Sequence, residues 1–318
     1  MARKNRELDA AMSAFRENPR KKTRKPKSNV DIYGSERDEY FRSFFTAEEP
    51  VDVHDGGPPE GFRWSIWDQS EPLERGPEPH PPWLVTDLAA VDHDLGALKS
   101  GKEADVRLYE RAVPDTDRSC LMASKRYRSA KNAHFNRSED YVSGRGIKNS
   151  REARALAKKT AFGKNIAAGR WSMAEFDALR NFWLAGVSVP YPIQVHGTEV
   201  LMQFVGSNEG EAAPRLAQLR PTERELNELW DQLTGDLVRL VRLGYTHGDL
   251  SAYNTCAWGG RLYMFDLPQI VDLYLNPKGF EFLSRDVANI GRWFVDHGLS
   301  PAKVDGLQAL LVVEAGIG

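Results

Sequence analysis

The feature that most constrains this chain is the stretch "THGDLSAYN", Thr246–Asn254, and the short apolar segments that follow it. "TCAW" and "RLYMFDL" are typical of strands, and the Gly259-Gly260 pair between them predicts a tight hairpin turn. Such a hairpin folds Asp266 back beside Asn254, five residues after Asp249. The sequence therefore predicts that two carboxylates and an amide meet at one turn.

These three side chains are suited to holding a divalent cation. Two carboxylates about 5 Å apart repel each other by a few kcal/mol, and a cation removes that cost. Mg²⁺ prefers one or two carboxylates together with water and phosphate oxygens. We therefore predict Asn254 and Asp266 as metal ligands, with Mn²⁺ as an alternative metal. Asp249 is left to orient or deprotonate an attacking hydroxyl or water.

Each of these residues, taken alone, is also explained by an ordinary structural role. An aspartate often caps a turn, an asparagine often forms an Asx-turn, and an acid often ends a strand. The combination of all three beside one hairpin favours a functional site. His247 is predicted to be structural, bonded to backbone near the loop.

Size and composition place few limits on the fold but several on the environment. A chain of 318 residues, 41% of them hydrophobic, is long enough for one large domain or two modest ones. No apolar stretch approaches the roughly 18 to 20 residues that span a bilayer, and "MARKNRELDAAMSAF" lacks a secretory signal pattern. Cys120 and Cys256 are far apart, which favours a reducing compartment without disulfides. We expect a cytoplasmic protein with no membrane partner.

The first 82 residues divide into a basic arm and an acidic, proline-rich segment. Residues 1–30 carry ten Lys and Arg against three acids, and residues 31–82 carry thirteen Asp and Glu against four Arg. Because apolar residues are sparse in both, we predict residues 1–82 to be largely disordered. The basic arm suits contact with ribosomal RNA or another polyanion, or it is a solvated tail that aids solubility.

The pattern changes at about Trp83, where a small β-rich unit is predicted. Strands are expected at 104–113, 120–128, 191–195 and 199–206, with "WSMAEFDALRNFWLAG" as a helix that Gly186 stops. The preceding basic stretch, "SREARALAKKTAFGKNIAAGR", is expected to be partly helical. These elements make an N-lobe of about residues 83–205.

The remainder, about residues 206–318, is predicted to be mainly helical. The clearest helix is 221–244, where Thr222 and Glu225 form a capping box and Gly244 ends the apolar stripe. The helix at 279–298 is expected to close the unit. The sequence therefore predicts an α+β fold of two unlike lobes, with a cleft between them.

The Asp249 loop and the Asp266 strand resemble the catalytic loop and metal-binding strand of the protein-kinase-like fold. Within that fold they are most similar to the RIO family of atypical serine/threonine protein kinases, closest to its RIO1-like branch. The resemblance runs from about Leu95 to Phe294. It implies a bilobal kinase fold with a truncated C-lobe and ATP bound with Mg²⁺ between the lobes.

The resemblance also assigns the nucleotide site. "KSGKEADV" resembles the RIO phosphate loop, "LMASKRYR" the strand with the phosphate-binding lysine, "WSMAEFDAL" the helix whose glutamate pairs with it, and "VLMQFVG" the hinge. The residues that it implies for nucleotide binding are Ser100, Gly101, Lys102, Val106, Ala123, Lys125, Glu175, Met202, Phe204 and Val205. Asp249 and Asp266 are the implied catalytic residues.

Departures from ordinary signalling kinases support the RIO resemblance. Ser251 occupies the position two after the catalytic aspartate, where typical kinases have a lysine. Asp266-Leu267-Pro268 replaces Asp-Phe-Gly, and Pro268 restricts any flip of this segment. About a dozen residues separate Asp266 from the predicted last helix, so we expect no activation loop and no large peptide-binding platform.

The resemblance implies transfer of the ATP γ-phosphate to a Ser/Thr hydroxyl, on an unknown protein or on the chain itself. It also implies an ATPase route, in which Asp266 takes the phosphoryl group and water clears the aspartyl-phosphate. Two alternatives remain open at this point. One is a small-molecule phosphotransferase of the aminoglycoside or choline type, and the other is a nucleotide-switched, ribosome- or RNA-associated binding protein.

Overall fold

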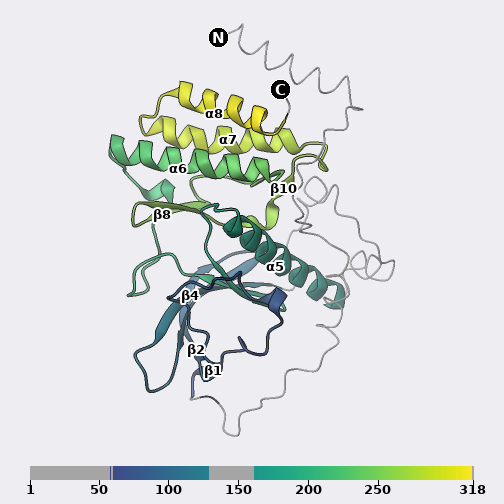
Figure 1. Ribbon diagram of the computed structural model, residues 1–318, viewed down its shortest axis with the longest axis vertical. Coiled ribbons are helices and arrows are strands. Elements are labelled where there is room, and N and C mark those ends of the chain that lie inside the picture. The colour runs from purple at the N-terminus through teal and green to yellow at the C-terminus, as the bar shows by residue number, and fades with distance from the viewer. Residues whose placement is uncertain (1–57, 59, 129–160, 317–318) are drawn as a thin grey trace.

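The computed structural model describes residues 58, 60–128 and 161–316. Figure 1 shows a β-sheet at one end, three stacked helices at the other, and helix α5 (Ala161–Leu184) between them. The sheet is antiparallel, with strand order β1-β2-β3-β4-β6-β5. Its strands are β1 (Phe62–Trp64), β2 (Val91–Ser100), β3 (Ala104–Ala112), β4 (Ser119–Tyr127), β5 (Pro192–His196) and β6 (Glu199–Gln203). The predicted α+β, bilobal architecture is confirmed.

Both faces of the sheet are covered. Alternate residues of a strand point to opposite faces, and β4 buries both sets. Ala123 and Tyr127 belong to the core cluster that includes α5, whereas Cys120 and Met122 belong to a second cluster on the other face. This alternation also places Lys125 on the α5 side.

The second cluster corrects the predicted domain boundary. We expected disorder up to residue 82, but the described part of this segment, from residue 60 onward, is folded onto the sheet. Phe62–Trp64 forms β1 against β2, Pro72–Glu74 forms the short helix η1, and Trp67 is buried with Leu84 and Val85. The acidic, proline-rich average of the segment hides these few apolar residues. Residues 1–57, with the basic arm, lie outside the described residues.

Helix α5 ends where it was predicted to end, because Gly186 adopts a positive φ of 76°. The helix begins at Ala161, inside the stretch that was expected to be partly helical, and runs without a break through the helix expected from Trp171. The helix packs against β4, β5 and β6 and also against η4 (Leu267–Gln269), on the helical side of the molecule. It therefore connects the two lobes.

The helical lobe consists of α6 (Glu223–Arg242), α7 (Gly279–Asp296) and α8 (Pro301–Glu314). Thr222 and Glu225 form the predicted capping box at the start of α6, and Gly244 follows its end with φ of 87°. We were wrong to expect α7 to be the last helix, because α8 packs against both α6 and α7. Of the helices that the structure describes, none combines the length and apolarity that crossing a bilayer requires.

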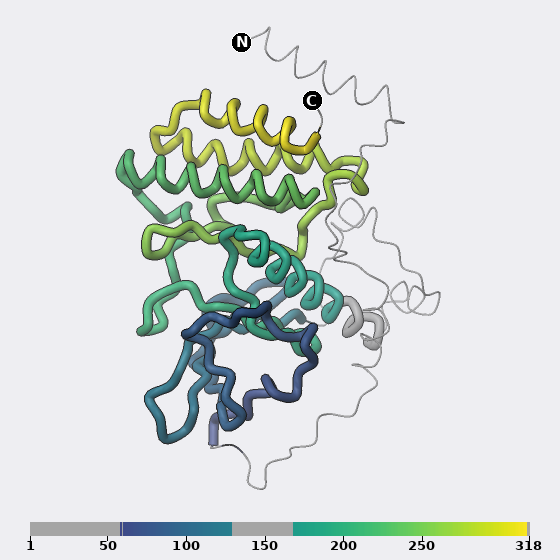
Figure 2. The backbone as a smooth tube through the Cα atoms, in the orientation of Figure 1, coloured from purple at the N-terminus to yellow at the C-terminus, as the bar shows by residue number. Residues whose placement is uncertain are grey.

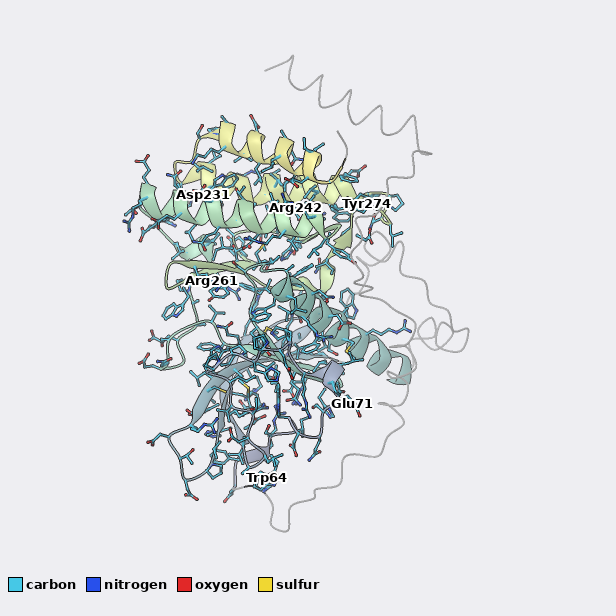
Figure 3. All side chains as sticks on the ribbon, in the orientation of Figure 1. Trp64, Glu71, Asp231, Arg242, Arg261 and Tyr274 are labelled. Atoms are coloured by element: carbon cyan, nitrogen blue, oxygen red, sulfur yellow. The ribbon has the colours of Figure 1, made fainter. Side chains whose placement is uncertain are left out.

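Short strands lie between the helices and the sheet. Strands β8 (Thr255–Trp258) and β9 (Arg261–Met264) form the predicted hairpin, and β7 (Tyr245–Thr246) pairs with β10 (Val271–Asp272). After α5 the chain returns to the sheet for β5 and β6 and then forms α6, and the short strands follow between α6 and α7, as the tube in Figure 2 shows. Figure 3 shows Trp64 at the sheet end and Asp231, Arg242 and Tyr274 at the helical end.

Candidate nucleotide and metal site

Lys125 is held between two carboxylates that come from different parts of the fold. Its Nζ donates to Glu175 Oε1 of α5 at 2.7 Å and to Asp266 Oδ1, two residues after β9, at 2.8 Å. The lysine side chain is 12% exposed and that of Asp266 is 41% exposed. The structure therefore brings together three of the predicted site residues that are far apart in sequence.

The charges of this group stabilise one another. Burial lowers the pKa of Lys125, but the charges of Asp266 and Glu175 outweigh burial, so the net pKa lies well above its ordinary value. The charge of Lys125 in turn lowers the pKa of the Asp266 carboxyl. Lysine and aspartate are therefore both ionised at neutral pH.

Tyr127 is a site residue that sequence reasoning missed. Its hydroxyl donates to Glu175 Oε2 at 2.5 Å, so both oxygens of that glutamate are bonded. Burial raises the pKa of Tyr127 well above its usual value, which keeps the hydroxyl a donor. The available signal was its position two residues after Lys125, on the same face of β4.

The predicted catalytic loop is closed by Asn254. Its Nδ2 donates to the backbone oxygen of Asp249 at 2.8 Å and to Asp249 Oδ2 at 3.3 Å. The backbone of Asn254 is also paired, since the Phe265 N–H donates to the Asn254 backbone oxygen at 3.1 Å. Gly259 and Gly260 both have positive φ, as a two-residue hairpin turn of type I′ requires. Asn254 is thus bonded to Asp249 through its side chain and to Phe265, the neighbour of Asp266, through its backbone.

Asp286 of α7 supports the loop from behind and was not predicted. It accepts from Thr246 Oγ1 at 2.7 Å, from the Gly248 N–H at 2.6 Å and from the Leu250 N–H at 3.0 Å. Burial raises the pKa of Asp286, and these donors offset part of that effect. No local pattern in the sequence connects Asp286 with a loop that lies far before it.

His247 has the structural role that we predicted. It is fully buried, its Nε2 lies 3.1 Å from the Phe265 oxygen, and its Nδ1 accepts from the Asp249 N–H at 3.4 Å. These bonds correspond to the tautomer with the proton on Nε2. The imidazole ties the catalytic loop to the strand that leads to Asp266.

Asp266 has a left-handed backbone, with φ of 70° and ψ of 56°. Helix η4 starts directly after it, and Leu267 and Pro268 are buried. Because α5 packs against η4, the element that carries Glu175 also fixes the segment that follows Asp266. The two acids that hold Lys125 are therefore positioned by one contact between α5 and η4.

The oxygen atoms available at this site fit Mg²⁺. The amide nitrogen of Asn254 is turned to Asp249, and its Oδ1 has no hydrogen-bond partner among the described residues. Oδ2 of Asp266 likewise has none there, since Lys125 bonds to Oδ1. Hard oxygen ligands of this kind suit Mg²⁺ or Mn²⁺. Within residues 58, 60–128 and 161–316 no group of three His, Cys, Asp or Glu side chains is arranged for a metal. The set therefore suits a cation that takes its other ligands from water and phosphate.

The predicted phosphate loop is the turn between β2 and β3. Ser100 Oγ donates to Asp105 Oδ1 at 2.7 Å and accepts from Arg128 Nη2 at 2.8 Å, and the Gly101 N–H donates to the Ala104 oxygen at 2.9 Å. Lys102 is exposed at the tip. The Gly101 N–H is thus engaged within the turn, so phosphate contact through this amide requires the turn to rearrange.

The predicted adenine-side residues lie on neighbouring strands. Val106 pairs with Lys125 across β3 and β4, and Ala123 pairs with Met202 across β4 and β6. Phe204 and Val205 follow the end of β6, and the Val205 oxygen accepts from the Ala213 N–H at 2.9 Å. The structure therefore places these residues on the strands next to Lys125 and at the connection between the lobes.

Comparison with known proteins identifies the family. The family model for the RIO domain matches residues 108–307, which include Lys125, Glu175, the Asp249 loop and Asp266. The chain belongs to the RIO family of atypical serine/threonine protein kinases. This membership was predicted, and it decides against the small-molecule phosphotransferase alternative.

Two curated relatives illustrate the similarity. The RIO-type serine/threonine-protein kinase Rio1 of Haloferax volcanii is 32% identical over 226 residues, which cover 71% of each chain. Serine/threonine-protein kinase RIO1 of Chaetomium thermophilum is 29% identical over 223 residues, covering 66% of this chain but only 40% of the relative. The solved Rio2 kinase from the same fungus superposes with a TM-score of 0.47 at 17% identity, covering 68% of this chain and 63% of that one.

Proposed function

We propose that the chain binds ATP with Mg²⁺ between its lobes and transfers the γ-phosphate, as a RIO-type kinase and ATPase. The observation that carries this proposal is the Lys125 ammonium, bonded at once to Glu175 and to Asp266. A lysine that two acids hold on a largely buried strand is oriented for an anion, and one of these acids, Asp266, is a predicted metal ligand. Mn²⁺ is the alternative metal.

Each side chain has a separate task in this proposal. Lys125, positioned by Glu175 and Tyr127, binds phosphate oxygens, while Asp249 accepts the proton of the attacking hydroxyl. Asn254 and Asp266 hold the cation, which neutralises phosphate charge when bound. Catalysis then comes from positioning and from charge neutralisation.

The acceptor is a Ser/Thr hydroxyl, of a protein substrate or of the chain itself, or the Asp266 carboxylate. In the second case an Asp266 oxygen bonds to the γ-phosphorus as the bond to the bridging oxygen breaks, and ADP leaves. Water then attacks the aspartyl-phosphate and releases inorganic phosphate. The 41% exposure of Asp266 supports its access to a phosphoryl group. A cytoplasmic location and contact of the basic arm with ribosomal RNA complete the proposal.

Lys125→Ala and Asp249→Asn test the assignment. We expect each to lower ATP hydrolysis and self-labelling from γ-labelled ATP by at least about a hundredfold, because phosphate binding or proton transfer is lost. Thermal unfolding shows whether the variants fold. Lys303→Ala, which alters an exposed lysine of α8, is the control and should retain activity. Full hydrolysis by both site variants would refute the proposal.

The chemistry of the label separates the two acceptors. A phosphoserine or phosphothreonine survives acid, whereas an aspartyl-phosphate is released by hydroxylamine. We expect hydroxylamine-sensitive label on Asp266 if the ATPase route dominates, and Asp266→Asn should remove it. Acid-stable label as the sole product would instead assign the chain to direct hydroxyl phosphorylation.

A further inference from the structure

Arg215 is a positively charged side chain beside the site that the functions assigned so far do not use. Its guanidinium carbon lies 3.6 Å from the centre of the Phe265 ring, and Phe265 directly precedes Asp266. Arginine stacked on an aromatic ring in this way presents its N–H groups around the edge of the stack. The position of Arg215 is thus tied to the residue next to the proposed metal ligand.

The backbone around Arg215 is fixed on both sides. The backbone of Arg215 forms an antiparallel β-bridge with that of Cys256 in β8. The Ala217 N–H donates to the backbone oxygen of Ala252, in the predicted catalytic loop, at 3.0 Å. Two residues before Arg215, the Ala213 N–H donates to the Val205 oxygen at the predicted hinge. Arg215 therefore lies on a short segment that runs from the hinge to the catalytic loop and β8.

The charge of Arg215 has no acidic partner within the described part of the chain. No carboxylate there lies within 4.0 Å of its guanidinium, whereas Arg63, Arg107, Arg111 and Arg128 each contact one. Burial lowers the pKa of Arg215, and the interactions with Cys256 and then with Asp266 oppose this effect. The guanidinium still remains protonated at any physiological pH. A half-buried cation without a counterion is costly unless an anion binds to it.

A charge count of the site indicates which anion this is. Asp249, Asp266 and Glu175 contribute three negative charges, Lys125 contributes one positive charge, and the positive charge of Lys99 acts on Asp266 without bonding to it. A triphosphate adds about four more negative charges, and Mg²⁺ offsets two. Ser251 supplies no charge at the position where typical kinases have a lysine. The site therefore has room for another cation that contacts the nucleotide.

We propose that Arg215 binds the nucleotide through the phosphates that ATP and ADP share. The assignment rests on the proposed function, because it requires adenine at the hinge and the γ-phosphate at Asp266. A residue between those two ends faces the middle of the nucleotide. Guanidinium N–H groups suit phosphate oxygens there, in charge-assisted hydrogen bonds.

Binding of adenosine, ADP and ATP to the full chain in Mg²⁺ tests this assignment. We expect Arg215→Gln to raise the Kd of ADP and of ATP by about tenfold or more and to leave adenosine unchanged, because only phosphate contacts are lost. Arg215→Lys should restore part of the affinity. Arg220→Gln removes an exposed arginine five residues away and should change none of the three constants.

Other outcomes overturn the proposal in distinguishable ways. Weaker binding of ATP alone would assign Arg215 to the γ-phosphate, and equally weaker binding of adenosine would make its role structural. Phe265→Leu keeps the charge but removes the stacking ring, and it should preserve the preference for ADP over adenosine. If the unaltered chain bound no ATP, the proposed function would fail. If Lys125→Ala lost ATP and Arg215→Gln did not, this inference alone would fail.

Discussion

Asp266 combines an unusual backbone conformation with a direct bond to Lys125. A residue with a side chain costs about 1 kcal/mol or more in the left-handed region, although aspartate tolerates it better than most. Lys125 and the start of η4 hold Asp266 there. The turn moves the carboxylate out of the line of β9 and toward the lysine of the other lobe. A strand continuing past Met264 would have placed it differently.

The two cysteines permit a test of burial at the residue scale. Burial raises the pKa of Cys256 to about 11 and also raises that of Cys120. Because only the thiolate reacts, about one Cys256 thiol in a thousand is reactive at pH 8, three pH units below its pKa. We expect iodoacetamide to modify Cys256 and Cys120 quickly only after unfolding. Mass spectrometry of native and urea-treated chain checks this, and rapid native labelling would contradict the burial.

At this scale, the sequence was informative where neighbouring residues form the site. Asp249, Asn254 and Asp266 are joined by one hairpin whose Gly259-Gly260 turn is visible in the sequence. Asp286 and Tyr127 were missed because their partners, Gly248 and Glu175, lie distant in the chain. Such contacts depend on how α7 and α5 pack, which no local pattern encodes.

At the scale of elements, helices α7 and α8 meet at a position that only glycine fits. A Cβ added to Gly291 would lie 2.6 Å from Val304 Cγ1, closer than such atoms approach. Both residues lie inside helices, so relief requires the two helices to move apart. The close approach also buries Leu307 and Leu311 of α8.

Gly291→Ala should therefore destabilise the chain by about 1–3 kcal/mol through overpacking, although alanine is the better helix former. In a Val304→Ala background the clash is gone, so the same substitution should be neutral or stabilising. Urea unfolding of the unaltered chain, the two single variants and the double variant measures this coupling in a double-mutant cycle. Additive effects would mean that Gly291 and Val304 do not limit the helix separation.

Element prediction succeeded where the capping and the apolar stripe agreed. Helix α6 has Thr222, Glu225 and Gly244 at its ends and a single buried face, so both limits were predicted. Helix α8 has apolar residues on several faces, including the exposed Leu310 and Val313, and no clear stripe. Its packing on α6 and α7 stabilises it, and this contact is not visible in its own sequence.

At the scale of the whole molecule, the segment before β2 completes the β-rich lobe. It covers the sheet face opposite α5, so that Met122 and Cys120 are buried as well as Ala123. Trp67 is 5% exposed within this cover, and Tyr191 bonds the Pro77 oxygen at 2.8 Å. A kinase lobe built only from residue 83 onward would keep Leu84 and Val85 on this face but would lack Trp67.

Trp67→Ala should lower the free energy of unfolding by about 3–5 kcal/mol, the usual cost of removing a buried tryptophan. Leu88→Ala is the control, since Leu88 is 68% exposed and its loss should change stability by less than about 0.5 kcal/mol. Denaturant unfolding of both variants gives the comparison. Equal and small effects would show that the segment adds little to the lobe.

The segment that covers this sheet face was not predicted, because the composition of residues 31–82 was judged as one average. Thirteen acids and many prolines in residues 31–82 outweigh the two tryptophans and the single leucine of this range in any average. The corrective signal was in β4, where "CLMASK" has apolar or small residues at both parities, as a strand buried on both faces requires. An exposed outer face would have alternated with polar residues.

The segment after Asp266 has a consequence for inhibitor design. Leu267 and Pro268 are buried in η4, against the helix that carries Glu175. Compounds that require Asp266, the proposed metal ligand, to swing outward would have to break this packing first. Screening for selective ligands is better directed to chemotypes that retain the inward aspartate and exploit the Arg215–Phe265 stack.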